Sequence, residues 1–241
     1  KMKGTVGKDG IERQFDNILQ GQAGGTIFRV DPAGYRINPP LEKRLPVQGK
    51  NLTLSIDIDL QQAAEEGLLD LIGAAVAIDV NTGEILALAS LPNYDLNDFT
   101  PRLSFAKAQQ IAESGAWTNR AIYGVYPPGS TFKILTAIAG LRSGILTPAS
   151  VYDTDGSFTV GRRVFRDHGG CVTGEIDFRL AIEQSVNTYF YYYGLQIGAE
   201  TLAAESRRFH LHEQTGIELP NESRRMIVPD AAWKKKVKQE S

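Results

Sequence analysis

Two prolines and a glycine stand directly before the most regular apolar pattern in this chain, and together they predict where a helix begins. Pro127 and Pro128 lack the backbone N–H that a helix interior needs, and Gly129 adds a further break in regular structure. Apolar residues then recur at helical spacing, at Phe132, Ile134, Leu135, Ile138 and Leu141. We therefore predict an amphipathic helix that starts at Ser130.

The first turn of this predicted helix carries a hydroxyl and an amine three residues apart. Positions i and i+3 share one helix face, so the side chains of Ser130 and Lys133 can meet. A serine hydroxyl becomes a nucleophile when a neighbouring base removes its proton, and a desolvated lysine can be that base. The alternative is that Ser130 merely starts the helix and Lys133 is solvated. A lysine in a first turn opposes the helix dipole, however, and this one lies in an apolar run. We interpret the pair as catalytic.

A second polar motif, Ser185-Val186-Asn187, lies further along the chain, before the aromatic run 189–193. Taken alone, a serine and an asparagine are explained equally well as helix caps or turn residues. Ser-x-x-Lys followed by Ser-x-Asn, however, gives two of the three motifs that mark penicillin-binding proteins and serine β-lactamases. The third is Lys-Thr-Gly. The order of the two motifs, more than either one, indicates acyl-transfer chemistry.

Several further segments carry a resemblance to one family. They are residues 10–16, 19–21, 54–57, 60–61, 73–79, 82–84, 119–121, 126–133, 185–187, 189–191, 228–230 and 233–234. In that order they resemble the class B penicillin-binding proteins, most of all the elongation-type penicillin-binding protein 2. The resemblance implies a peptidoglycan D,D-transpeptidase that cross-links stem peptides during cell elongation and that β-lactams acylate.

The resemblance also implies a role for each motif residue. Ser130 would attack the carbonyl of the penultimate D-alanine while Lys133 accepts its proton, and Ser185 would relay a proton to the leaving amine. Asn187 would hold Lys133 and the substrate amide in position. The backbone N–H of Ser130 would supply half of the oxyanion hole. No cofactor is required for this chemistry.

The fold implied is an α+β transpeptidase fold, in which an antiparallel sheet packs between helices. We expect residues 1–50 to be the remnant of an N-terminal pedestal region and residues 51–241 to be the transpeptidase domain. Lys-Thr-Gly does not occur in the sequence. The chain is therefore expected to lack the strand that carries this motif, and with it a complete active site.

Local patterns predict elements for the second region. Residues 52–56 are a strand candidate, residues 60–71 a helix, and residues 74–79 with 84–89 a hairpin that turns at 81–83. Consecutive aromatic residues in the run 189–193 point around a helix axis, so packing in a core explains them better than a ligand platform does.

The net charge and the apolar content of the chain bear on which partners it can bind and whether it can cross a membrane. A formal net charge of −2 gives no electrostatic reason to expect nucleic acid. The sequence has no run of about 18 apolar residues that could span a membrane. The resemblance implies a catalytic domain in the periplasm, held at the bacterial inner membrane by an N-terminal anchor that this chain lacks. It also implies a RodA-type glycosyltransferase and an MreC-type scaffold as partners.

Asp167, His168 and Cys171 lie within five residues of one another, and Asp153 and Asp155 lie a short way upstream. Side chains of these types can ligate zinc, and Asp153, Asp167, His168 and Cys171 would complete a four-ligand site. Some relatives of penicillin-binding protein 2 are thought to hold zinc close to this loop. The other interpretation is a glycine-rich surface loop with solvated polar side chains, and the sequence leaves both open. His210 and His212 lie in a polar stretch, where surface positions are expected.

Two other functions fit parts of the pattern. A β-lactam-hydrolysing relative would need a device that activates water, and no glutamate-containing loop of that type is recognisable. A non-catalytic scaffold or binding module would act through residues 1–50. Because a scaffold would tolerate the Ser130→Ala substitution and a transpeptidase would not, this substitution separates the two.

Overall fold

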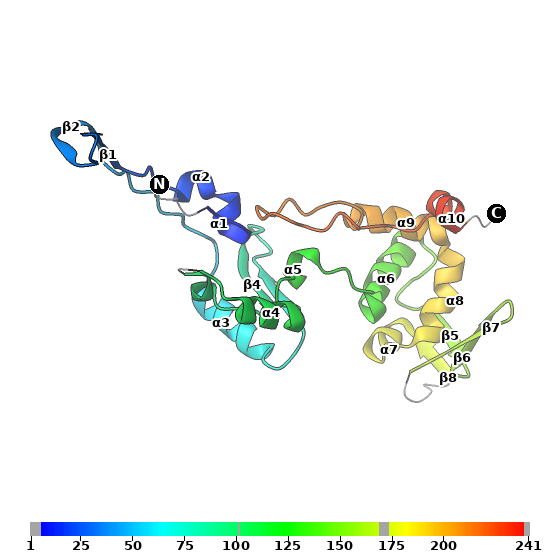
Figure 1. Cartoon of the computed structure of the whole chain (residues 1–241). Coiled ribbons are helices and arrows are strands. Elements are labelled where there is room, and N and C mark those ends of the chain that lie inside the picture. The colour runs from blue at the N-terminus through cyan, green and yellow to red at the C-terminus, as the bar shows by residue number, and fades with distance from the viewer. Residues whose placement is uncertain (1–5, 101, 169–173, 239–241) are drawn as a thin grey trace. The chain divides into compact units, whose positions relative to one another are not determined.

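The computed structural model describes residues 6–100, 102–168 and 174–238, and these form two compact units. The first unit comprises residues 1–124 and 216–223, and the second comprises residues 125–215 and 224–241. Both units contain helices and strands (Figure 1). None of the helices in the described ranges is both long enough and apolar enough to cross a membrane.

The first unit begins with two short helices and a hairpin. Its elements are α1 (Gly10–Gln14), α2 (Asp16–Leu19), β1 (Gly25–Val30), β2 (Arg36–Arg44), α3 (Ile58–Gly67), β3 (Gly73–Ile78), β4 (Ile85–Leu91), the 3-10 turn η1 (Leu96–Phe99), α4 (Phe105–Ser114) and α5 (Arg120–Tyr123). Strands β1 and β2 pair antiparallel, as do β3 and β4. The β3–β4 hairpin contacts both α3 and α5. The predicted hairpin at 74–79 and 84–89 is thus confirmed.

The predicted strand at 52–56 is wrong. This segment runs beside β4 through single hydrogen bonds, from Ser55 Oγ to the Ile85 carbonyl at 2.7 Å and from Asp57 N to the Leu86 carbonyl at 2.9 Å. A continuous ladder does not form, because the chain turns here into α3. The Asp57 carboxylate accepts hydrogen bonds from the backbone N–H groups of Asp59 and Leu60, and this cap starts the helix two residues before the predicted position.

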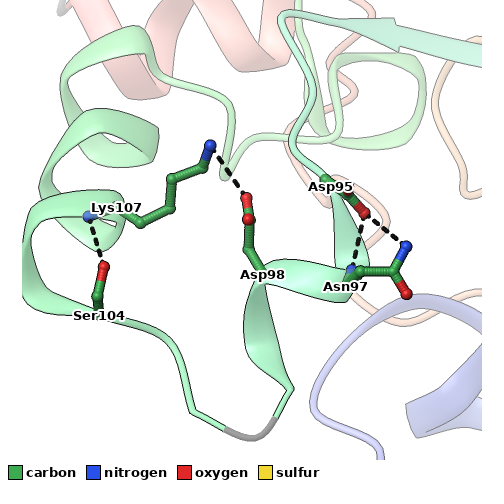
Figure 2. Close-up of polar contacts among 5 residues, drawn as sticks. All are labelled: Asp95, Asn97, Asp98, Ser104 and Lys107. Carbon is green, nitrogen blue, oxygen red and sulfur yellow. Dashed lines mark hydrogen bonds and ion pairs between the residues drawn. The ribbon is translucent and has the colours of Figure 1, made fainter.

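Side-chain caps also organise the connection between β4 and α4, which Figure 2 shows. Asp95 accepts hydrogen bonds from the backbone and the side-chain amide of Asn97, at 2.8 and 2.9 Å, and so begins η1. Ser104 caps α4 by accepting from Lys107 N at 3.2 Å. The Lys107 ammonium lies 3.2 Å from Asp98 Oδ2, so one ion pair joins the two capped turns.

The second unit contains the helix predicted after the two prolines. Its elements are the 3-10 turn η2 (Gly129–Thr131), α6 (Phe132–Ser143), β5 (Val151–Thr154), β6 (Ser157–Val160), β7 (Arg163–Arg166), β8 (Gly174–Asp177), α7 (Phe178–Glu183), α8 (Asn187–Ile197), α9 (Ala199–Arg208) and α10 (Ala231–Lys238). Strand β5 pairs antiparallel with β8, and β6 pairs with β7. Helices α6, α8 and α9 contact one another.

The core of the second unit is built from α6, α8 and the strands beside them. Its buried residues are Ala137, Ala139, Leu146, Ile176, Ala181, Val186, Tyr189, Phe190, Tyr193 and Ile197. Buried tyrosines need partners for their hydroxyl groups, and Tyr189 and Tyr193 donate to the carbonyls of Ser150 and Val151 at 3.0 and 2.8 Å. Most of the aromatic run therefore packs as predicted.

A buried carboxylate adds a polar link between two of these helices. Glu205 of α9 is only 7% exposed, and its oxygens lie 3.3 Å from the Arg142 guanidinium of α6 and 3.5 Å from that of Arg208. Because both arginines remain half exposed, they keep part of their hydration while they neutralise the buried charge. This arrangement holds α9 against α6, the helix that follows Ser130.

We predict that Gly140→Ala destabilises the second unit. An added Cβ would lie 2.5 Å from Leu146 Cδ1 and 3.0 Å from Ile197 Cδ1, and both side chains are buried. Overpacking costs about 1–3 kcal/mol, which exceeds the gain of about 1 kcal/mol in helix propensity. A lower free energy of unfolding in urea is the expected result.

The matched control for this substitution is Gly194→Ala in α8. There the added Cβ would meet Thr136 Cγ2 at 3.9 Å, an ordinary contact distance. Only the gain in helix propensity of about 0.5–1 kcal/mol should remain, so stability should be unchanged or higher. Equal effects of the two substitutions would contradict close packing at Gly140.

Candidate active site

Ser130 lies in a 3-10 turn and not in the α-helix itself, which begins two residues later than predicted. Gly129 has a φ of +57°, in the left-handed region that an α-helix does not contain, so the regular helix cannot extend back through it. Thr131 Oγ1 donates to the Pro128 carbonyl at 2.6 Å and fixes this turn. Ser130 and Lys133, the second residue of α6, nevertheless line the same pocket.

Lys133, the second residue of α6, joins that helix to the turn before α8. Its ammonium donates to the Ser185 carbonyl at 2.5 Å, to Ser185 Oγ at 3.0 Å and to Asn187 Oδ1 at 2.6 Å. An ammonium has three donors, so these three acceptors satisfy it completely. The structure thus brings together three of the four residues that the two sequence motifs identify.

Opposing influences act on the pKa of Lys133. Burial lowers the pKa of Lys133 below its ordinary value, and the negative charge of Asp167 opposes part of this effect. The ammonium also lies 5.7 Å from the centre of the Phe190 ring, whose face attracts a cation. None of the hydrogen bonds that the described residues make to this ammonium comes from a carboxylate, and desolvation is the largest influence on its pKa.

Ser130, Lys133 and Asn187 line a single open pocket of about 370 Å³ within the second unit. Phe132 and Thr136 of α6, with Phe190 and Tyr191 of α8, provide further parts of its wall. Ser130 is exposed in this pocket, whereas Lys133 and Asn187 are half-buried. A ligand in the pocket would therefore reach the hydroxyl from solvent and meet the amine at its inner side.

The turn that carries Ser185 has a backbone conformation that sequence reasoning missed. Ser185 has a φ of +53°, which is uncommon for a residue other than glycine. The turn is held by a hydrogen bond from Val186 N to the Ala181 carbonyl at 3.0 Å, and the Val186 side chain is almost fully buried. This geometry aims both the carbonyl and the hydroxyl of Ser185 at Lys133.

Asp167 contributes to the site in a way that its sequence context did not indicate. Its Oδ1 accepts hydrogen bonds from the backbone N–H groups of Asn187 and Thr188 at 2.5 and 3.0 Å. Its Oδ2 accepts from Thr188 Oγ1 at 2.8 Å. Both carboxylate oxygens are thus engaged by the first residues of α8. Asp167 is half-buried and lies far from this helix start in the sequence, so no sequence pattern would have identified its role.

The zinc site suggested by the sequence stays a prediction. Asp153, Asp167 and His168 belong to the described part of the chain, whereas Cys171 lies outside it. Among the residues that the structure describes, no three His, Cys, Asp or Glu side chains are grouped so that they could hold a metal ion.

Comparison with known families identifies two regions. Residues 73–240 match the penicillin-binding protein transpeptidase domain, and residues 1–54 match the penicillin-binding protein dimerisation domain. The chain belongs to the penicillin-binding protein transpeptidase family. The predicted boundary at residue 50 stays a prediction, since the two matched regions leave residues 55–72 between them.

Curated relatives carry the name peptidoglycan D,D-transpeptidase MrdA. The protein from Acinetobacter baumannii is 35% identical over 233 residues, which are 95% of this chain and 34% of that protein. The Escherichia coli protein is 32% identical over 235 residues, with 96% and 37% of the two chains covered. The chain thus spans little more than a third of the length of these relatives.

Solved structures of the family agree with the fold. Penicillin-binding protein 2 from Helicobacter pylori superposes with a TM-score of 0.83 at 35% identity, over 98% of this chain and 45% of that one. The complex of the same protein with MreC gives a TM-score of 0.82, with 98% and 44% of the two chains covered. The predicted α+β penicillin-binding protein fold is confirmed.

We predict that the Lys133 side chain titrates below the ordinary lysine range. The measurement is a carbon-detected NMR titration of Cε, assigned by the loss of the signal in Lys133→Arg. Because burial penalises the charged form, the neutral amine should appear at a lower pH than for a solvated lysine. A midpoint at or above the ordinary lysine pKa would contradict desolvation as the dominant effect.

Proposed function

We propose that this protein is a peptidoglycan D,D-transpeptidase that cross-links stem peptides through a serine acyl-enzyme during cell-wall elongation. The observation that carries the proposal is the Lys133 ammonium, which hydrogen-bonds Ser185 and Asn187 in a pocket that Ser130 also lines. The curated relatives named peptidoglycan D,D-transpeptidase support the substrate class. Each residue role below is part of this proposal.

In the first step a neutral Lys133 amine takes the proton of Ser130, whose Oγ attacks the carbonyl carbon of the penultimate D-alanine. Burial lowers the pKa of Lys133 from its ordinary value, which is the direction that this step needs. Collapse of the tetrahedral intermediate breaks the C–N bond to the terminal D-alanine. The Lys133 ammonium returns its proton to the leaving amine through the Ser185 hydroxyl, which lies 3.0 Å from Nζ.

In the second step an amine of a neighbouring stem peptide attacks the ester carbonyl. Its proton moves to Lys133 and then back to Ser130 Oγ as the ester bond breaks, so the enzyme returns to its starting state. Asn187 accepts a hydrogen bond from Nζ at 2.6 Å, which keeps the amine in the pocket through both steps. The backbone N–H of Ser130 is proposed as one half of the oxyanion hole. These steps need no cofactor.

We predict that a fluorescent penicillin forms one covalent adduct on Ser130 of the full-length protein. A β-lactam carbonyl presents the same electrophile as the D-alanyl-D-alanine end, but its ring nitrogen stays tethered after the C–N bond breaks. Ser130→Ala should abolish the adduct because no nucleophile remains. Lys133→Ala should slow its formation by about 100-fold or more, as expected for loss of a general base. Intact-mass spectrometry and peptide mapping measure both results.

Three outcomes distinguish the possible functions. A stable adduct on Ser130 supports the transpeptidase. An adduct that is released rapidly with hydrolysed penicillin would favour a β-lactam-hydrolysing relative. A folded protein that takes no label at all, and whose Ser130→Ala variant supports normal cell shape, would sink the enzymatic function in favour of a scaffold.

We also propose that the protein works on the outer side of the bacterial inner membrane together with elongation partners of the RodA and MreC types. Peptidoglycan is assembled on that side. The solved complex of penicillin-binding protein 2 with MreC supports an MreC-type partner, as does a second neighbour described as a peptidoglycan synthase complex. In this chain every residue of β2 is exposed, apolar ones included, so the β1–β2 hairpin offers a surface for such a partner.

We predict that substituting Ile37 and Leu41 of β2 together by serine weakens capture of an MreC-type protein. Both side chains are exposed, at 40% and 59%, so their loss should leave the fold and the penicillin adduct unchanged. The matched control is Glu42→Gln, an exposed polar position on the same strand. Co-purification with tagged MreC measures the effect. Undiminished capture by the double variant would exclude this hairpin as the contact.

A further inference from the structure

Helix α8 begins without a capping side chain from its own sequence. The residue before its first turn is Val186, whose side chain makes no capping hydrogen bond. The first N–H groups of a helix have no partners within the helix, and burying them unpaired is costly. Asp167, which follows strand β7, supplies the missing acceptor from twenty residues earlier in the chain, with Oδ1 bonded to both Asn187 N and Thr188 N.

The same segment fixes the side chain of Asn187. The Nδ2 of Asn187 donates to the Arg166 carbonyl at 3.3 Å, while its Oδ1 accepts from Lys133 Nζ. The carbonyl of Arg166 can only accept, so it selects the amide orientation that leaves the oxygen toward Lys133. Residues 166 and 167 therefore hold Asn187 by both its backbone and its side chain.

A buried hydroxyl pair holds this arrangement from the opposite side. Thr188 is fully buried, donates its hydroxyl proton to Asp167 Oδ2, and accepts from Thr154 Oγ1 at 2.9 Å. Thr154 of β5 in turn accepts from Gly156 N at 3.0 Å. Every hydrogen bond in this chain of groups lies inside the second unit, so strand β5 supports the position of Asp167 through Thr188.

We propose that Asp167 is a positioning residue for acylation, which fixes the first turn of α8 so that Asn187 holds the Lys133 amine beside Ser130. This proposal rests on the proposed transpeptidase function, because it concerns the same pocket. A displacement of a catalytic group by about 1 Å can slow a reaction by about 100-fold, and a frayed first turn would permit such a displacement. Asp167 itself contacts neither Lys133 nor the substrate in this mechanism.

The experiment compares Asp167→Ala with Asp167→Asn in the full-length protein. Alanine removes all three hydrogen bonds to α8. The asparagine oxygen can still accept from the two backbone N–H groups, and its amide can donate to Thr188 Oγ1 if that hydroxyl donates to Thr154 instead. We expect the limiting first-order rate of penicillin acylation to fall by about tenfold or more for alanine, and asparagine to restore it to within about threefold.

Two features of the measurement separate positioning from stability. Rates are compared at the plateau of each pH profile, so a changed pKa of Lys133 does not enter. The matched control is Asp57→Ala in the first unit, which also removes a carboxylate that caps a helix by accepting two backbone N–H groups. Its acylation rate should equal that of the wild type, and the dissociation constant of the non-covalent penicillin complex should change little for Asp167→Ala.

Each result decides the proposal. Slow acylation by Asp167→Ala, with rescue by asparagine and a normal control, supports it. An unchanged rate for Asp167→Ala, an equal loss in Asp57→Ala, or no rescue by asparagine in a protein with wild-type thermal stability overturns it while the transpeptidase proposal stands. A wild-type protein that takes no penicillin on Ser130 overturns both.

Discussion

A single ammonium group holds the site together. The three donors of Lys133 bind oxygens of Ser185 and Asn187, so this one side chain connects the start of α6 to the turn before α8. Elsewhere the two helices are joined by apolar packing, which is strong but not directional. The hydrogen bonds of Lys133 set where the turn lies relative to the hydroxyl of Ser130, and the packing of the helices makes that geometry rigid.

The burial of the Lys133 ammonium costs free energy, and its contacts offset only part of that cost. Removing an ammonium from water is unfavourable, and Lys133 compensates with neutral oxygens and a ring face but without a carboxylate in direct contact. A carboxylate beside it would stabilise the fold further and would also raise its pKa, which would leave less neutral amine to act as a base. The carboxylate of Asp167, whose negative charge raises the pKa of Lys133, is instead hydrogen-bonded to the backbone of α8. Under the proposed mechanism, this arrangement keeps Lys133 available as a base at some expense in stability.

What the sequence predicted well is what local patterns encode. The proline and glycine break, the helical spacing after it and the alternating pattern of the β3–β4 hairpin all depend on neighbouring residues, and each was found in the structure within a few residues. The predicted strand at 52–56 is wrong, although its sequence pattern is typical of a strand. The Asp57 carboxylate caps α3, so the chain turns into that helix instead of continuing as a strand. The positive φ of Ser185 and the role of Asp167 depend on contacts between distant segments. A positive φ is usually predicted from glycine, and Ser185 is not a glycine. The residues around Asp167 were equally consistent with a zinc ligand, so no local pattern indicated either feature.

The four motif residues are distributed over several elements of the second unit, so the site depends on how these elements pack together. Ser130 is set by a 3-10 turn with a glycine in the left-handed region, Lys133 by a regular helix, and Ser185 and Asn187 by a strained turn and a helix start. No single element fixes more than two of them. Their relative positions then depend on the packing of α6 on α8, where Gly140 leaves no space for an additional methyl group, and on the carboxylate of Asp167. A substitution in either place displaces one part of the site against another while each part stays intact, so the first property to be lost should be the alignment of hydroxyl and amine and only later the fold.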